Sequence, residues 1–213
     1  MRRPTALFLL SFLLVLGVGL LPLHAADSPS GKMTADQLRL EMRKLWEDHI
    51  GWTRHFIVSA LADLPDKQAT TERLLQNQKD IGNAIKPFYG DAAGTKLTGL
   101  LEEHILIAAD IVTAAKAGDT TKLEADKQRW SANADQIATF LSGANPKHWP
   151  AADMKSMMND HLATTTAELE ARLREDWKAD VAAYERVHEQ ILEMSDMLAE
   201  GIAKQFPEKL RRK

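Results

Sequence analysis

Cysteine is missing from the 213-residue chain, which excludes disulfide bonds and thiolate metal ligands. Glycine and proline are sparse, at 11 and 8 residues, so collagen-like and low-complexity chains are excluded as well. A basic surplus is also missing, because 27 lysines and arginines face 30 aspartates and glutamates. The resulting formal charge of −3 predicts no nucleic-acid partner.

The longest apolar run lies at the beginning of the chain, where residues 1–25 have the layout of a secretory signal. Arg2 and Arg3 precede the apolar residues 6–21, and small residues follow up to Ala25. We expect cleavage near Ala25 and a periplasmic or secreted protein, with an uncleaved N-terminal anchor as the alternative. No later run approaches spanning length, so the mature chain is predicted to have no transmembrane domain.

The rest of the sequence reads as helices. Apolar residues recur every three or four positions, and period-two alternation is missing, which predicts an all-α protein. The expected helices cover about 34–64, 70–87, 92–117, 121–142, 151–173 and 176–205. These lengths and short connections predict an antiparallel helical bundle of about six helices, or four long rods with breaks.

Several helix ends have recognisable signals. Thr34-x-x-Gln37 and Thr121-x-x-Glu124 are capping boxes that are predicted to begin two helices. Pro87 is expected to close the second helix, and Gly118 to cap the third.

The sequence predicts one structured region. We expect a helical bundle domain over residues 34–207, preceded by a flexible lead-in at 26–33. A basic tail at 208–213 is expected to be a solvated end.

Four histidines fall on the core-facing stripes of four different predicted helices. They are His49, His104, His161 and His188. A buried imidazole without a partner costs about 1–3 kcal/mol, so four of them should meet one another, a metal, a ligand or carboxylates. Imidazole suits transition metals, and bundle cores assemble such sites from facing helices. These histidines are therefore predicted to hold a transition metal (copper, zinc or iron) or a small ligand.

Neighbouring residues bear on the kind of metal. Met157 and Met158 beside His161 would suit a soft ion such as copper(I). Candidate oxygen ligands or partners are Glu103, Glu168 and Glu185. A ferritin-like di-iron site is disfavoured, because Glu185-x-x-His188 is the only Glu-x-x-His pair at these histidines.

The alternative interpretation is a structural or partner-binding helical domain with no metal and no catalysis. In that case the histidines make only internal hydrogen bonds. Asn133 is expected to bond loop backbone rather than a functional group. No nucleophile elbow, phosphate-binding loop or nucleophile–base pair is visible, so nothing specifically favours an enzyme.

Some strings in the sequence are distinctive. They are His49-x-x-Trp52-Thr53-Arg54, Lys86-Pro87-Phe88-Tyr89-Gly90, Trp130-x-x-Asn133-Ala134-Asp135 and Gly201-Ile202-x-Lys204-Gln205-Phe206-Pro207. On these strings the chain resembles an uncharacterised family of small bacterial helical proteins, some of which are named glycosyltransferase or acetylglutamate kinase. The resemblance implies a helical domain over nearly the whole mature chain and supplies no site residue. Those enzyme names do not fit, because both would require an α/β fold with strands.

Overall fold

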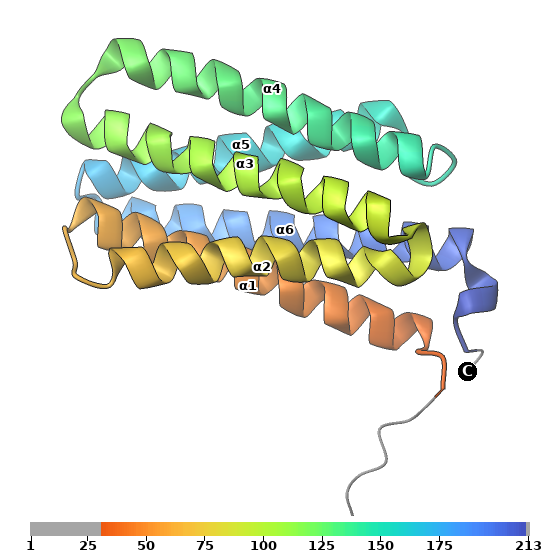
Figure 1. Ribbon diagram of the computed structural model, residues 1–213. Helices are drawn as coiled ribbons and strands as arrows, with labels where there is room; N and C mark the ends of the chain where they lie inside the picture. Colours follow the sequence, from red (N-terminus) through yellow and green to blue (C-terminus); the bar gives the residue numbers. More distant parts are fainter. Residues whose placement is uncertain (1–30, 212–213) are drawn as a thin grey trace, which may run out of the picture. The chain divides into compact units, whose positions relative to one another are not determined.

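The computed structural model describes residues 31–211, and the expected all-α fold is confirmed. The predicted signal at 1–25 lies outside the described residues. The helices are α1 (Ala35–Leu61), α2 (Lys67–Tyr89), α3 (Asp91–Ala117), α4 (Thr120–Ala144), α5 (Ala151–Leu173) and α6 (Trp177–Gln205), followed by the short 3₁₀ helix η1 (Pro207–Lys209) (Figure 1). Between residues 31 and 211 there is no strand, only an isolated bridge between Thr34 and Arg211.

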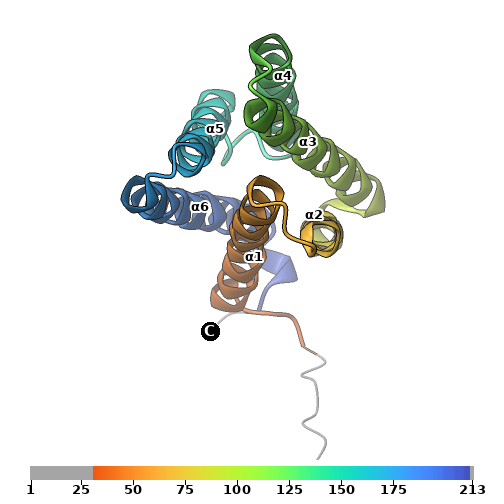
Figure 2. The same ribbon diagram turned by 90° about the vertical axis from the view of Figure 1, so that its left-hand side faces the viewer.

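The six helices close into a ring. Each helix packs against the next one in the chain, and α6 returns to pack against α1, as the end-on view shows (Figure 2). Short connections make neighbours antiparallel, and only Gly90, with φ 85°, separates α2 from α3. The prediction of an antiparallel six-helix bundle is therefore confirmed. The alternative of four broken rods is not found, because each break reverses the chain.

Two of the predicted helix ends are confirmed and two are wrong. At the start of α1 the backbone N–H of Gln37 donates to Thr34 Oγ1 at 3.1 Å, and that of Thr34 donates to Gln37 Oε1 at 2.8 Å. Gly118 ends α3 in the left-handed conformation, with φ 67°. The capping box at Thr121 is wrong, because the Asp119 side chain already accepts from the N–H of Lys122, and α4 begins one residue earlier than expected.

Pro87 does not close α2, which runs on to Tyr89. A proline removes its own N–H and crowds the preceding turn, but it leaves the following residues free to hydrogen-bond. The N–H of Gly90 still donates to the Lys86 carbonyl at 2.9 Å. The helix therefore ends at Gly90 rather than at the proline.

The core consists of two apolar clusters with polar side chains between them. One cluster includes Ile81, Ile191 and Ile202, and the other includes Leu74, Ile111 and Leu169. On each of α1 to α5, a buried polar residue lies where the helix passes from one cluster to the other. These residues, called the polar layer below, are His49, Asn77, Gln78, His104, Asn133 and His161.

The segment after α6 is anchored to the bundle, and the expectation of a solvated tail is wrong for Leu210, whereas Glu208, Lys209 and Arg211 are exposed. Leu210 is only 9% exposed, and the backbone N–H of Arg211 donates to the Met33 carbonyl at 2.8 Å. Lys209 Nζ donates to the carbonyls of Pro87 and Phe88 at 2.8 and 3.0 Å. Among the helices of residues 31–211, none is both long enough and apolar enough to cross a membrane.

Candidate functional site

Three of the four predicted histidines meet inside the bundle. His49 on α1, His104 on α3 and His161 on α5 are 3%, 3% and 5% exposed. The His161 ring lies 5.8 Å from the His49 ring and 6.1 Å from the His104 ring, measured between centroids. The expected convergence of these three side chains is confirmed, while their role as metal ligands stays a prediction.

His188 does not join them, and its expected inward position is wrong. Its side chain is 40% exposed, and Nε2 lies 3.1 Å from Oε1 of Glu47 on α1. On α6 the neighbouring Val187 and Ile191 face the core. Since successive helical residues are turned by about 100°, His188 points away from the face that Val187 buries.

The three histidines are part of a row of five rings across the interior. Trp46 packs edge-on against His49 at 5.5 Å, and Trp130 packs against His104 at 5.0 Å. The indole Nε1 atoms of Trp46 and Trp130 are buried and have no hydrogen-bond partner. Flat rings from α1, α3, α4 and α5 therefore surround the centre of the polar layer.

A buried amide fixes the hydrogen on the His104 ring. His104 Nδ1 lies 2.8 Å from Asn133 Oδ1, and Asn133 Nδ2 donates to the Leu100 carbonyl at 3.1 Å. Because the amide nitrogen is used in that bond, its oxygen faces the ring, and Nδ1 must carry the hydrogen. The expectation that Asn133 bonds loop backbone is wrong, since Asn133 lies within α4 and holds His104 in one tautomer. Of the proposed oxygen partners, Glu103 approaches this pair, with Oε2 3.3 Å from Asn133 Nδ2.

His161 is held in the same way from α6. Its Nδ1 lies 3.2 Å from Gln190 Oε1, and Gln190 Nε2 donates to the Met157 carbonyl at 3.1 Å. The hydrogen of His161 is therefore also on Nδ1. Among the described residues, Nε2 of His104 and of His161 has no hydrogen-bond partner.

His49 is less completely satisfied. Gln78 Nε2 donates to the Leu74 carbonyl at 2.8 Å and to Asn77 Oδ1 at 3.1 Å, which leaves Gln78 Oε1 without a partner. Nδ1 of His49 is also buried without one. Sequence reasoning missed Gln78 and Gln190. The position of Gln78 between Leu74 and Ile81 on the α2 stripe was the available signal.

Burial keeps all three imidazoles neutral. It lowers the pKa of His49 well below its ordinary value of 6.5, that of His104 to about 3 and that of His161 to about 4. The neighbouring ring of His161 lowers the pKa of His49 and His104 further, because two nearby positive charges would repel. At neutral pH the layer therefore presents neutral rings with unused lone pairs.

The rings border an internal cavity of about 30 Å³. It is lined by His49, His104 and His161, by Met42, Met158 and Met194, and by apolar side chains such as Trp46, Ile137 and Leu198. No carboxylate belongs to the described lining. A space of this size holds a water molecule or a bare ion but no organic ligand.

The spacing of the rings fits pairwise metal coordination. With metal–nitrogen bonds of 2.0–2.1 Å, two imidazoles on one ion have centroids at most about 6.5 Å apart. The separations of 5.8 and 6.1 Å lie within that limit. Within residues 31–211, however, no group of three histidines or carboxylates is placed to hold an ion together. The structure thus offers pairs of imidazoles rather than a closed set of three.

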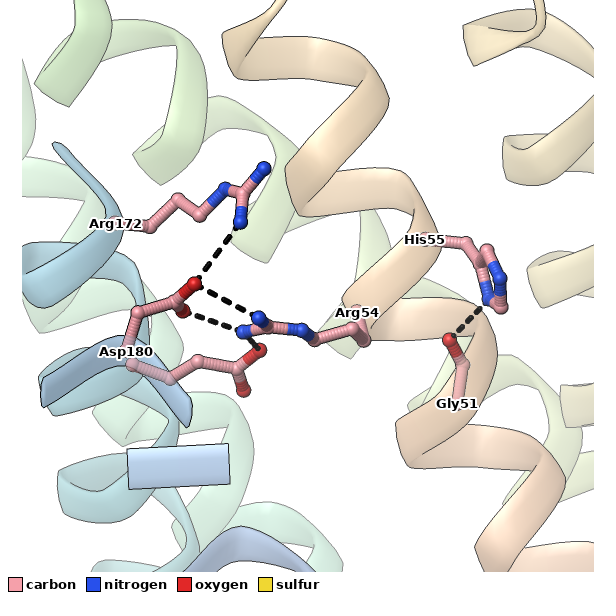
Figure 3. A network of polar contacts seen from close by, with 6 residues as sticks. Gly51, Arg54, His55, Arg172 and Asp180 are labelled. Carbon is pink, nitrogen blue, oxygen red and sulfur yellow. Dashed lines mark hydrogen bonds and ion pairs between the residues drawn. The ribbon is translucent and has the colours of Figure 1, made fainter. Parts of the chain in front are cut away.

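Glu168, a proposed oxygen partner of the histidines, belongs to a separate ion network. Arg54 Nη1 donates to Glu168 Oε1 at 2.8 Å. Arg54 also donates to both carboxylate oxygens of Asp180, and Arg172 donates to one of them at 2.9 Å (Figure 3). Burial raises the pKa of Glu168, and its second oxygen has no partner. The network ties α1, α5 and the start of α6 together.

His55 points away from both sites. It lies on α1 on the opposite side from the Arg54 side chain, and its Nδ1 is 2.8 Å from the Gly51 carbonyl (Figure 3). This agrees with the sequence spacing, which turns His55 by about 120° from His49.

No protein-family model, curated protein or solved structure matches the chain. The resemblance to a bacterial helical family stays a prediction. The class that the fold and site define is a six-helix bundle with a buried layer of histidines.

Proposed function

We propose that the protein is an exported helical bundle that binds one transition-metal ion in the cavity between His49, His104 and His161. One observation carries this proposal. Two of these rings are held at Nδ1 by side-chain amides, their Nε2 atoms have no described hydrogen-bond partner, and both rings border the same cavity.

This arrangement has the chemistry of metal ligands. A ligating histidine usually donates its second ring N–H to a carbonyl or carboxylate, which orients the ring and makes the free nitrogen more basic. Asn133 Oδ1 and Gln190 Oε1 occupy that place for His104 and His161. A lone pair left unused in an apolar core is costly, so an ion in the cavity would offset that cost.

Export is the second part of the proposal, and it rests on the sequence alone. The signal-like residues 1–25 would direct the chain to the periplasm or the exterior, with cleavage near Ala25. The missing cysteines fit an oxidising compartment.

The second candidate function is a structural or partner-binding domain without a metal. It is favoured by the missing group of three ligands in the described part of the chain. In that case one or two waters in the cavity would hydrogen-bond the free nitrogens.

Metal analysis of the untagged protein separates the two candidates. The full mature chain would be exposed separately to copper, zinc and iron, desalted and analysed by mass spectrometry for bound metal. We expect one equivalent of at least one metal, and loss of that metal in His161→Leu with its helical content unchanged. His55→Leu is the matched control and should bind like the parent. A parent protein that retains no metal after any of the three exposures would reject the proposal.

A further inference from the structure

We infer that the ion is a soft monovalent one, copper(I), bound by two imidazoles and a methionine thioether from the cavity wall. This inference rests on the proposed metal-binding function and specifies its ligand.

The cavity wall supplies the soft donors. Met42, Met158 and Met194 line the cavity together with the three histidines and are 2%, 5% and 2% exposed. Thioether sulfur selects copper(I) among biological metals, whereas zinc and iron prefer harder or anionic ligands. Of the two methionines beside His161, Met158 lines the cavity, and Met157 is buried beside the cleft between α5 and α6.

The charge of the site also favours a monovalent ion. Every described donor at the cavity is neutral, and no carboxylate belongs to its lining. Glu168, two helical turns along α5 from His161, is already bound by Arg54. Because the cost of removing an ion from water rises with the square of its charge, a divalent ion would lose about four times as much hydration as copper(I).

The small number of ligands that can reach one ion also favours copper(I). His161 pairs with His49 or with His104, but the three rings do not form one ligand group. Structural zinc sites almost always require four ligands. A filled-shell monovalent ion is satisfied by two or three, so one imidazole pair and one sulfur suffice.

The structure also provides an access route for a cation. A surface cleft of about 250 Å³ lies between α5 and α6, and its lining includes Asp153, Asp160, Glu193, Met157, Met194 and Met197. Acidic side chains concentrate cations from solution. Met194 lines both this cleft and the internal cavity, so its side chain lies between the two spaces.

Affinity measurements on the full mature protein test the inference. Copper(I) would be titrated anaerobically against a competing chelator, silver(I) would serve as the air-stable probe, and zinc(II) and copper(II) would be titrated in parallel. We expect 1:1 binding of copper(I) and silver(I), at least 100-fold tighter than that of either divalent ion. Met158→Leu combined with Met194→Leu should weaken silver(I) binding at least 10-fold. Met33→Leu, which lines neither the cavity nor the cleft, is the matched control and should leave the affinity unchanged.

The outcomes separate the inference from the function on which it rests. If zinc(II) or copper(II) binds as tightly as copper(I) and is lost in His161→Leu, the metal site stands and the soft-ion assignment is wrong. If the double methionine variant folds like the parent and binds silver(I) unchanged, the thioether ligands are wrong. If no ion binds, both proposals fail.

Discussion

His104 and Asn133 form a 2.8 Å hydrogen bond inside the bundle, and the Asn133 carboxamide decides which nitrogen of the imidazole carries the hydrogen. The bond joins α3 to α4. Because Nδ1 carries the hydrogen, the free lone pair of His104 is on Nε2. The hydrogen bond that joins the two helices therefore also leaves a ring nitrogen able to bind a metal.

Asn133→Ala should destabilise the protein by about 2 kcal/mol, because it leaves His104 Nδ1 buried without an acceptor. Urea unfolding followed by circular dichroism measures this loss. Asn83→Ala on the exposed face of α2 is the matched control and should have an effect of about 0.5 kcal/mol or less. Equal effects of the two substitutions would show that the buried amide does not support the ring.

The free energy of unfolding of the metal-free protein should fall as the pH is lowered from 7 to 5. The pKa of the histidines is near 6.5 in the unfolded chain, but burial lowers it to about 3 for His104 and about 4 for His161. Between these values the unfolded chain binds more protons, so acid favours unfolding. Each buried histidine contributes up to about 1.4 kcal/mol per pH unit below pH 6.5.

Chemical unfolding at several pH values from 5 to 7 checks this dependence above the range in which most carboxylates titrate. His104→Leu removes one of the three buried groups and should flatten the curve. Stability that stays constant over this range would contradict the burial of neutral imidazoles.

Gly201→Ala should destabilise the bundle, although alanine normally favours a helix by about 1 kcal/mol over glycine. A Cβ at Gly201 would overlap the indole of Trp149, which is 2% exposed. We expect a net loss of about 1–3 kcal/mol from this overpacking. Gly143→Ala on α4 meets nothing within 4 Å and should be neutral or slightly stabilising. The melting temperatures of both variants show whether each substitution stabilises or destabilises the protein.

Arg54→Leu should cost about 3–5 kcal/mol, because it leaves the buried carboxylates of Glu168 and Asp180 without their main partner. Arg39→Leu is the control, since Arg39 is 53% exposed and its partner Asp196 keeps Arg43. The control should change stability much less, because solvent screens an exposed ion pair. Similar losses in the two variants would argue against a special role for the buried network.

The sequence predicted correctly those features that depend on one helix alone, such as which of its residues are buried. The apolar stripes around His49, His104 and His161 predicted their burial, and burial in one bundle brought the three together. His188 shows the weakness of this reasoning, because on α6 the adjacent Val187 fits the same stripe and is the residue that faces inward. Pro87 shows a second weakness, because the residues after a proline can still form helical hydrogen bonds, and α2 continues beyond it.

Partners from different helices could not be predicted. Gln190 lies 29 positions from His161, and Asp180 lies 126 positions from Arg54. Periodicity places each of these residues on its own helix but does not give the relative height of two helices. Which polar groups meet was therefore visible only in the structure.

The most direct test of the metal-binding account is ¹⁵N NMR of the imidazole nitrogens, recorded on metal-free protein and after one equivalent of silver(I) or, in a separate sample, zinc(II). We predict that His104 and His161 carry their hydrogen on Nδ1 without metal, and that at least one ion shifts the Nε2 signals of two of the three buried histidines. The signals of His55 and His188 should stay in place. Buried Nε2 signals that neither ion moves, or a hydrogen found on Nε2 of His104 and His161, would contradict the account.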